Sequence, residues 1–173
     1  MPDRSTLAAS LTSEPAAFAA DASRYLSTDS IEPYESFDPA VVPVRTGDLL
    51  ERERRLLWKA WTLDEAPFGV VLSGAAYEDN RIIYANRYFR ELSGYGLDEL
   101  VGENPRMLQG PATESEPVAR LHEALRTWEP ATVELWNYRR DGERFRNRVS
   151  LVPVADDAGT ITHWFGIQRR LDE

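Results

Sequence analysis

Few side chains of this sequence could carry catalytic or metal chemistry. The chain has no cysteine, which excludes thiol nucleophiles, zinc thiolates, iron–sulfur clusters and disulfides. Its two histidines, His122 and His163, have no carboxylates at ligand spacing, so we expect a helix-surface residue and a strand residue and no metal site. Carboxylate pairs such as Asp156 and Asp157 fall in turns, and no P-loop, nucleophile elbow or dinucleotide fingerprint occurs. We therefore expect a protein that is not an enzyme.

A second set of polar side chains, the amides, suits binding rather than catalysis. Asn137, Asn147 and Gln168 lie in short β-rich runs, where alternation turns each amide to one face and its neighbours to the other. An amide offers both a donor and an acceptor, so it can match a polar ligand edge without bringing net charge into a buried pocket. Taken alone, each would more often be a surface strand residue or a turn former.

The elements that would position these amides form one α+β domain. Strands are expected at 68–73, 81–85, 132–138, 145–154 and 161–168, and helices at 86–92, 97–101 and 113–128. Asn86 is expected to cap the first of these helices. The Asp141-Gly142 pair predicts a tight hairpin, and residues 156–159 a second turn, so the last strands should form an antiparallel meander. Helices over one face of such a sheet can enclose a pocket.

The first part of the chain is predicted to extend this domain. Within residues 1–47 a helix is expected at 15–26, capped by Ser13, and prolines after it leave a segment that either wraps over a folded surface or stays mobile. Residues 48–66 are expected to form an amphipathic helix capped by Asp48. Its leucines suit packing on the sheet or pairing with a second copy; they are Leu49, Leu50, Leu56, Leu57 and Leu63.

The charge balance and hydropathy restrict the partners. The chain carries 29 acidic and 20 basic residues, a net charge of −9, which argues against nucleic acid and anionic lipid as partners. No apolar run approaches the roughly 20 residues that span a bilayer, and no signal-like hydrophobic core follows the start. We expect a cytoplasmic protein with no nucleic-acid or membrane partner.

The run GENPRMLQG, residues 102–110, resembles the flavin-pocket motif of LOV domains, a flavin-binding class of PAS domain. Pro105 stands where that family has its reactive cysteine. The family pattern continues in order on both sides of the motif, at residues 82–86, Phe89, 93–95, 100–102, 137–142, Asn147 and 165–168. The resemblance covers about residues 68–170. It implies a PAS fold at 67–170, with a five-stranded antiparallel sheet, short helices covering one face, and the N-terminal helical extension.

The resemblance also implies a cofactor, FMN, with riboflavin and FAD as open alternatives. Asn137 and Asn147 would bind the pyrimidine edge of the isoalloxazine ring, and Gln168 would reach its O4 and N5. Asn104 and Gln109 match positions that hold the ribityl chain or the ring.

Phosphate binding is implied mainly for Arg106, whose fork suits phosphate oxygens. Many LOV domains have a second arginine on the long helix. Here His122 takes that position, and Arg120 lies nearby but about 160 degrees further round the helix. The sequence therefore predicts weaker phosphate binding.

The missing thiol changes the chemistry that the resemblance implies. In LOV photochemistry a cysteine sulfur bonds the flavin, and no such adduct can form here. A blue-light or redox sensor remains, signalling through flavin photoreduction to a semiquinone and a hydrogen-bond switch of Gln168. Trp164, which shares a strand face with Gln168, and Tyr84 are candidate electron donors, although core packing is an equally open reading of Trp164.

Two assembly questions stay open at this point. A homodimer through the N-terminal helix or the sheet face is expected, with a downstream signalling partner, and the alternative is a cofactor-free PAS module for protein interaction or dimerisation. The sequence ends just after Arg170, so output is expected through the 48–66 helix unless the chain is a fragment of a longer regulator. A small flavoenzyme would need substrate-site residues, for which the sequence offers no candidates.

Overall fold

The strands expected from the sequence form one sheet in the computed structural model, which describes residues 3–43 and 49–171. They are β1 Gly69–Gly74, β2 Ile82–Ala85, β3 Ala131–Tyr138, β4 Arg144–Ala155 and β5 Ile161–Arg170, paired antiparallel in the order β2-β1-β5-β4-β3. Gly142 and Gly159 take the positive φ values of 89° and 84° that the two predicted turns require. The predicted α+β class, PAS fold and terminal meander are confirmed.

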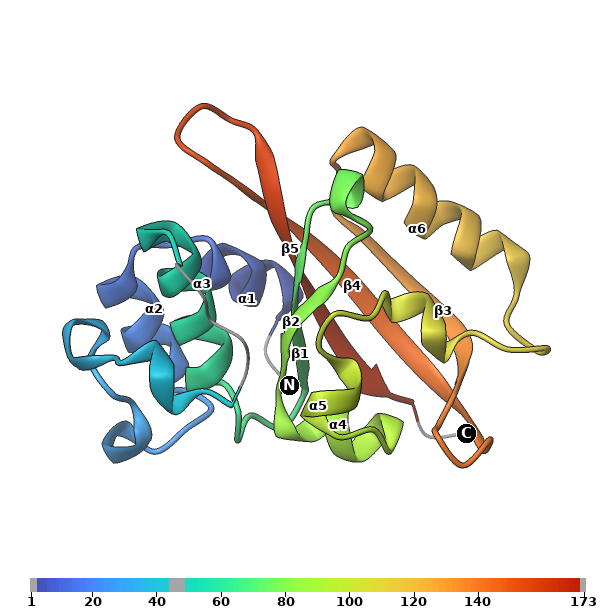
Figure 1. Cartoon of the computed structure of the whole chain (residues 1–173), viewed down its shortest axis with the longest axis horizontal. Helices are drawn as coiled ribbons and strands as arrows, with labels where there is room; N and C mark the ends of the chain where they lie inside the picture. The colour runs from blue at the N-terminus through green and yellow to red at the C-terminus, as the bar shows by residue number, and fades with distance from the viewer. Residues whose placement is uncertain (1–2, 44–48, 172–173) are drawn as a thin grey trace.

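One face of the sheet, here called the cavity face, carries Val71, Leu135 and Val149. The helices that follow β2 lie on it: α4 Arg87–Ser93, α5 Leu97–Leu100 and α6 Ser115–Thr127, with the 3₁₀ turn η5 Pro105–Leu108 between α5 and α6 (Figure 1). A further 3₁₀ turn, η4 Ala76–Glu78, joins β1 to β2. The sequence did not predict η5. Pro105 opens it directly after Asn104, whose side-chain oxygen accepts the Arg106 N–H at 2.8 Å.

The opposite face, the N-terminal face, carries Val70, Leu72, Phe165 and Ile167 and is also covered by helices. These are α1 Arg4–Leu11, α2 Pro15–Ala22 and α3 Glu51–Thr62 (Figure 1). The predicted helices on the cavity face are therefore joined by a second helical layer on the other side. Within the described parts of the chain, no helix is both long and apolar enough to cross a membrane.

Residues 23–43, which follow α2, wrap over the folded surface, as in the first of the two predicted alternatives. They form three short turns, η1 Thr28–Ser30, η2 Tyr34–Ser36 and η3 Pro39–Val41. Phe37 and Val42 are buried against α3, and the Trp58 indole donates to the Glu32 carbonyl at 2.9 Å.

Helix α1 was not predicted, and its docking depends on one residue of α3. Lys59, which is buried, donates to the carbonyls of Leu11 at 2.8 Å and Ser13 at 2.5 Å, and burial lowers its pKa to about 8. The Ser13 carbonyl therefore helps to hold α1 against Lys59, and the prediction that Ser13 caps α2 is wrong. The N-cap residue of α2 is Glu14, without a side-chain cap. A helix this short is stable mainly through such tertiary contacts.

The leucines of α3 are used by the chain's own core. Leu56 and Leu57 are buried between α3, the N-terminal segment and the sheet, while Leu50 is 64 % exposed. In this conformation the predicted leucine seam is not offered to a second copy, and dimerisation stays a prediction. Helix α3 begins at Glu51 with Leu50 as its N-cap residue, and the predicted cap Asp48 lies outside the described residues.

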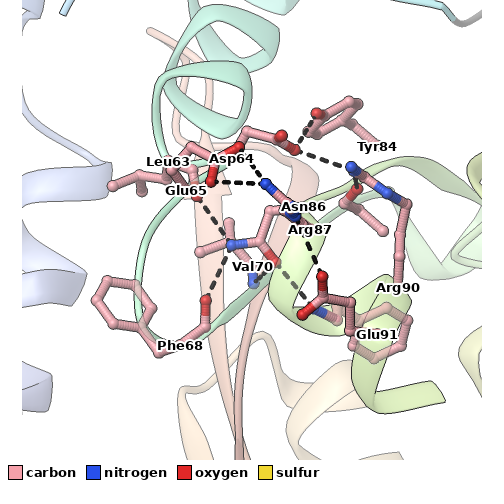
Figure 2. A network of polar contacts seen from close by, with 12 residues as sticks. Leu63, Asp64, Glu65, Phe68, Val70, Tyr84, Asn86, Arg87, Arg90 and Glu91 are labelled. Atoms are coloured by element: carbon pink, nitrogen blue, oxygen red, sulfur yellow. Dashed lines mark hydrogen bonds and ion pairs between the residues drawn. The ribbon is translucent and has the colours of Figure 1, made fainter. Parts of the chain in front are cut away.

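Asn86 joins three elements at the base of the sheet (Figure 2). Its Oδ1 accepts the backbone N–H groups of Val70 at 2.9 Å and Phe89 at 3.2 Å, the second of which is the predicted helix cap. Its Nδ2 donates to the carbonyls of Leu63 and Phe68, each at 2.9 Å. All four capacities of the buried amide are filled, so Asn86 ties the end of α3 to β1 and α4.

An ion pair beside Asn86 makes a second link from α3 to the core. The Arg90 guanidinium donates to Asp64 at 2.9 Å and to the Ala85 carbonyl at 2.7 Å, and the Tyr84 hydroxyl donates to Asp64 at 2.5 Å (Figure 2). Burial and the Asp64 hydrogen bond raise the pKa of Tyr84. The chain leaving α3 is thus held by side chains of β2 and α4.

The lowered pKa of the buried His163 predicts that the protein loses stability in mild acid. Burial and the nearby Arg52 charge lower its pKa from 6.5 to about 4, outweighing Glu53, whose carboxylate lies 3.9 Å from Nε2. The unfolded chain therefore binds a proton below about pH 6.5 that the folded chain binds only near pH 4, so the free energy of unfolding falls as pH falls through this window. We expect His163 to account for a loss of about 1–2 kcal/mol between pH 7 and pH 5.

Urea unfolding of wild type, His163→Gln and His122→Gln at both pH values measures this contribution. His163→Gln should lose less stability on acidification than wild type, while His122→Gln, which changes an exposed histidine, should behave as wild type does. Equal losses in all three proteins would contradict the prediction.

Candidate functional site

A cavity of about 260 Å³ lies between the cavity face of the sheet, η5 and α6. Its volume is near the lower end of small-molecule sites, which span roughly 300–1,000 Å³. Apolar side chains make most of the wall, with Val71, Leu135 and Val149 from the strands and Leu121 and Leu125 from α6. Such a wall excludes water, so the polar groups that enter the cavity determine what it can bind.

The three strand amides meet in this cavity. Asn137, Asn147 and Gln168 are all buried and all line it. The Asn147 amide donates to Asn137 Oδ1 at 2.9 Å, and the Asn137 amide donates to the Leu108 carbonyl at 3.4 Å. Asn147 Oδ1 and Gln168 Oε1 are buried without a hydrogen-bond partner among the described residues. An unpaired buried polar atom is costly, so these oxygens are available to a ligand.

Trp164 lies on the same strand face as Gln168 and lines the cavity. It is 1 % exposed, and its indole N–H also lacks a hydrogen-bond partner in the described part of the chain. Gly166 stands between the two. A Cβ at Gly166 would lie 2.9 Å from Gln168 Nε2, so the glycine leaves the room that this amide occupies. Neither the unpaired indole nor this clearance was evident from the sequence.

The mouth of the cavity holds the remaining predicted contacts. Asn104, Pro105, Arg106, Gln109 and His122 all line it. Asn104 is already engaged, because its amide donates to the Asp79 carbonyl at 2.7 Å. Arg106 forms an ion pair with Asp79, at 2.9 Å between Nη1 and Oδ1. Sequence reasoning missed Asp79, which lies in a turn 27 residues from Arg106 and matches no motif that we used.

Two predicted residues lie away from the cavity. Arg120 does not line it, and its guanidinium donates to the Thr132 carbonyl at 3.3 Å, so the structure does not bring it to the predicted cofactor site. Tyr84 faces the N-terminal layer, where its ring lies 6.0 Å from that of Trp61. Tyr84 therefore does not line the cavity, and its role as an electron donor stays a prediction.

The residues present fit a flavin ring. The ring has an apolar body and one polar edge, and the cavity pairs an apolar wall with unfilled amide oxygens and an indole donor at buried positions. Within residues 3–43 and 49–171, no three His, Asp or Glu side chains come together as a possible metal site. The arrangement can bind and orient a planar, uncharged heterocycle.

Comparison with known proteins places the chain among sensory domains. A family profile described as PAS domain matches residues 67–169. The bacterioopsin transcriptional activator of Halobacterium salinarum is 44 % identical over 124 residues, 72 % of this chain and 18 % of that protein. A blue-light-activated histidine kinase of Rhizobium johnstonii is 40 % identical over 104 residues, 60 % of this chain and 30 % of the kinase. The chain thus spans less than a third of these relatives' length.

Among solved structures, the LOV domain of the blue-light-activated histidine kinase EL346 from Erythrobacter litoralis superposes with a TM-score of 0.59 at 34 % identity. The match covers 62 % of this chain and 98 % of that domain. The chain therefore belongs to the PAS domain family, its structural neighbours are LOV domains, its homologues include blue-light receptors, and it contains no cysteine.

Proposed function

We propose that this chain is a flavin-binding blue-light or redox sensor that works without a cysteinyl adduct. The observation that carries the proposal is that three buried groups line one cavity and have no hydrogen-bond partner within residues 3–43 and 49–171. They are Asn147 Oδ1, Gln168 Oε1 and the Trp164 indole N–H. Homologous kinases described as blue-light-activated support it. FMN is the first candidate, and riboflavin and FAD carry the same ring.

Binding is assigned to the strand amides. Asn137 and Asn147 would hold the polar edge of the ring, and Gln168 would meet the neighbouring O4 and N5. Val71, Leu135 and Val149 would pack on its apolar body and exclude water. When bound, the flavin supplies absorption of blue light and the capacity to accept an electron.

Trp164 is the proposed electron donor in place of the missing thiol. Its indole is the only tryptophan side chain among the described residues that line the cavity. Trp164 would supply the one electron that a light-excited flavin accepts, solvent would supply the accompanying proton, and a thiol reductant in solution would return an electron to the indole. Pro105, at the position of the family's cysteine, has no group that could compete for this role.

Gln168 is the proposed switch. Gln168 Nε2 would donate to the flavin N5 when that nitrogen is an acceptor, and the amide would have to turn and present Oε1 if the nitrogen became protonated. Gly166 leaves the space in which the amide can turn. Phe165 and Ile167, which alternate with Gly166 and Gln168 along β5, point to the N-terminal face and pack in the same cluster as the leucines of α3. A change in β5 would therefore reach the N-terminal layer.

Absorption spectroscopy tests the proposal. The purified chain, loaded with flavin, should show the structured blue band of an oxidised flavin and should lose it on illumination with a thiol reductant. Trp164→Phe should slow this photoreduction by at least about tenfold, a change that corresponds to only about 1.4 kcal/mol in the barrier. Trp136→Phe is the matched control, because Trp136 does not line the cavity and lies beneath Arg144.

Two results would count against this function. Colourless protein after loading with flavin would reject flavin binding and favour the cofactor-free interaction module. Photoreduction of Trp164→Phe at the wild-type rate would reject Trp164 as the donor. The cavity and its unpaired atoms weigh against the cofactor-free alternative, because a module without a ligand gains stability by packing that space with side chains.

A further inference from the structure

At the mouth of the cavity, the guanidinium of Arg106 is paired with the carboxylate of Asp79. Arg106 Nη1 lies 2.9 Å from Asp79 Oδ1 and Nη2 lies 3.4 Å from Oδ2, so the planar fork faces the carboxylate. The Asn104 amide donates to the same Asp79 Oδ1 at 3.2 Å. All three residues line the cavity.

The loop holds Asp79 in this position. Its backbone is left-handed, with φ 66°, and its N–H donates to the Ala76 carbonyl at 3.0 Å. The next residue, Asn80, is tied by its N–H to the Ala75 carbonyl at 2.9 Å and by its side chain to the Gly74 carbonyl at 3.0 Å. The carboxylate is therefore presented to the mouth by a loop with its own hydrogen bonds, and not only by its bond to Arg106.

The charges of this pair cancel. Among the described residues that line the cavity, Arg106 is the only arginine and Asp79 the only acid. The Arg106 guanidinium holds the pKa of the Asp79 carboxyl below its usual value, so the carboxyl is ionised at neutral pH. A phosphate monoester carries about −1.5 to −2 charges at pH 7. Such a group would meet an attraction from Arg106 and a repulsion from Asp79 of similar size.

We propose that Asp79 sets the flavin specificity of this chain by neutralising Arg106, so that the cavity binds the ring and the uncharged polyol chain and gains little from a phosphate. Riboflavin and FMN then bind with similar affinity. The inference rests on the proposed function and names the chemical form of flavin that the site takes. Gln109, at the mouth, offers a neutral partner to the polyol hydroxyls.

Titration of the flavin-free full chain with riboflavin and with FMN, followed by quenching of flavin fluorescence, tests this specificity. In wild type the two dissociation constants should agree within about threefold, since opposite charges at similar distance nearly cancel. Asp79→Asn should tighten the binding of FMN about five- to tenfold and leave the binding of riboflavin unchanged, because the repulsion between the carboxylate and the phosphate is removed. Asparagine tolerates the left-handed backbone, so the variant should fold.

Glu78→Gln is the matched control. It removes the adjacent carboxylate, which does not line the cavity, and changes the net charge equally, so the FMN-to-riboflavin ratio should stay at the wild-type value. Raising the salt concentration should weaken FMN binding to Asp79→Asn and leave riboflavin binding as it was.

Three results would overturn the inference. Wild type could bind FMN more than about tenfold tighter than riboflavin, which would mean that Arg106 remains available to phosphate. Asp79→Asn could leave both dissociation constants unchanged or change both by the same factor, which would mean that the carboxylate does not act on the phosphate. If wild type and all variants bind neither flavin, the proposed function fails and the inference fails with it.

Discussion

Replacing Asn86 with alanine is expected to lower the free energy of unfolding by about 3–5 kcal/mol, because two N–H groups and two carbonyls lose their partner in the core. The cap of α4 is lost in the same step. Domains of this size have a total stability of only about 5–15 kcal/mol, so the variant should unfold at much lower urea concentration. Urea titration followed by tryptophan fluorescence measures the effect.

Asn137→Ala is the matched control for Asn86→Ala. It removes the same side chain from a buried strand position beside the cavity, where Oδ1 accepts one hydrogen bond of 2.9 Å from Asn147 and the amide nitrogen donates only over 3.4 Å. We expect a loss of about 1–2 kcal/mol, typical of one buried hydrogen bond whose donor is left without its acceptor. Equal losses in the two variants would show that Asn86 does not join the elements as Figure 2 shows.

Asn86 also illustrates what local sequence reasoning can and cannot predict. Its cap of α4 was predicted and is confirmed, because a cap involves residues three positions apart. Its bonds to Leu63 and Phe68 were not, because they depend on where the chain before β1 is placed. The same distinction applies to the N-terminal layer. Helix α1 is docked by Lys59, 48 residues from Leu11, and no local pattern predicts that contact.

The candidate site shows a similar division. Strand alternation predicted that Asn137, Asn147 and Gln168 share a cavity, because β3, β4 and β5 are regular at these positions. In β2, side chains two residues apart do not point to the same face of the sheet. The register shifts between Leu72 and Ser73 of β1, so Tyr84 faces the N-terminal layer although Ile82, two residues earlier, packs on the cavity face. A bulge of this kind changes the face of a side chain and leaves no reliable signal in one sequence.

Replacing Asn147 with leucine is expected to weaken flavin binding about 100-fold, the loss of two hydrogen bonds of about 1–1.5 kcal/mol each. Asn147 is 1 % exposed, and its Oδ1 has no partner among the described residues, so this atom is available only to a ligand. Leucine has a similar size and no polar atom. The free energy of unfolding of the flavin-free protein should change by less than about 1 kcal/mol, because the lost hydrogen bond to Asn137 is offset by removal of the unpaired Oδ1 from the core.

A large fall in affinity with little change in stability separates a binding role from a structural one. A residue that only supported the fold would lower stability and affinity together when replaced, whereas one held ready for a ligand lowers affinity alone. Arg148→Leu is the control on the same strand, since Arg148 points away from the cavity and donates to Glu134 at 2.8 Å. The affinity of this variant for flavin should equal that of wild type. Unchanged affinity in Asn147→Leu, or a parallel fall in affinity and stability, would contradict the assignment. The cost of leaving this oxygen unpaired in the flavin-free chain is what the ligand would remove on binding, so the affinity of the site and the instability of its ligand-free form have the same physical origin.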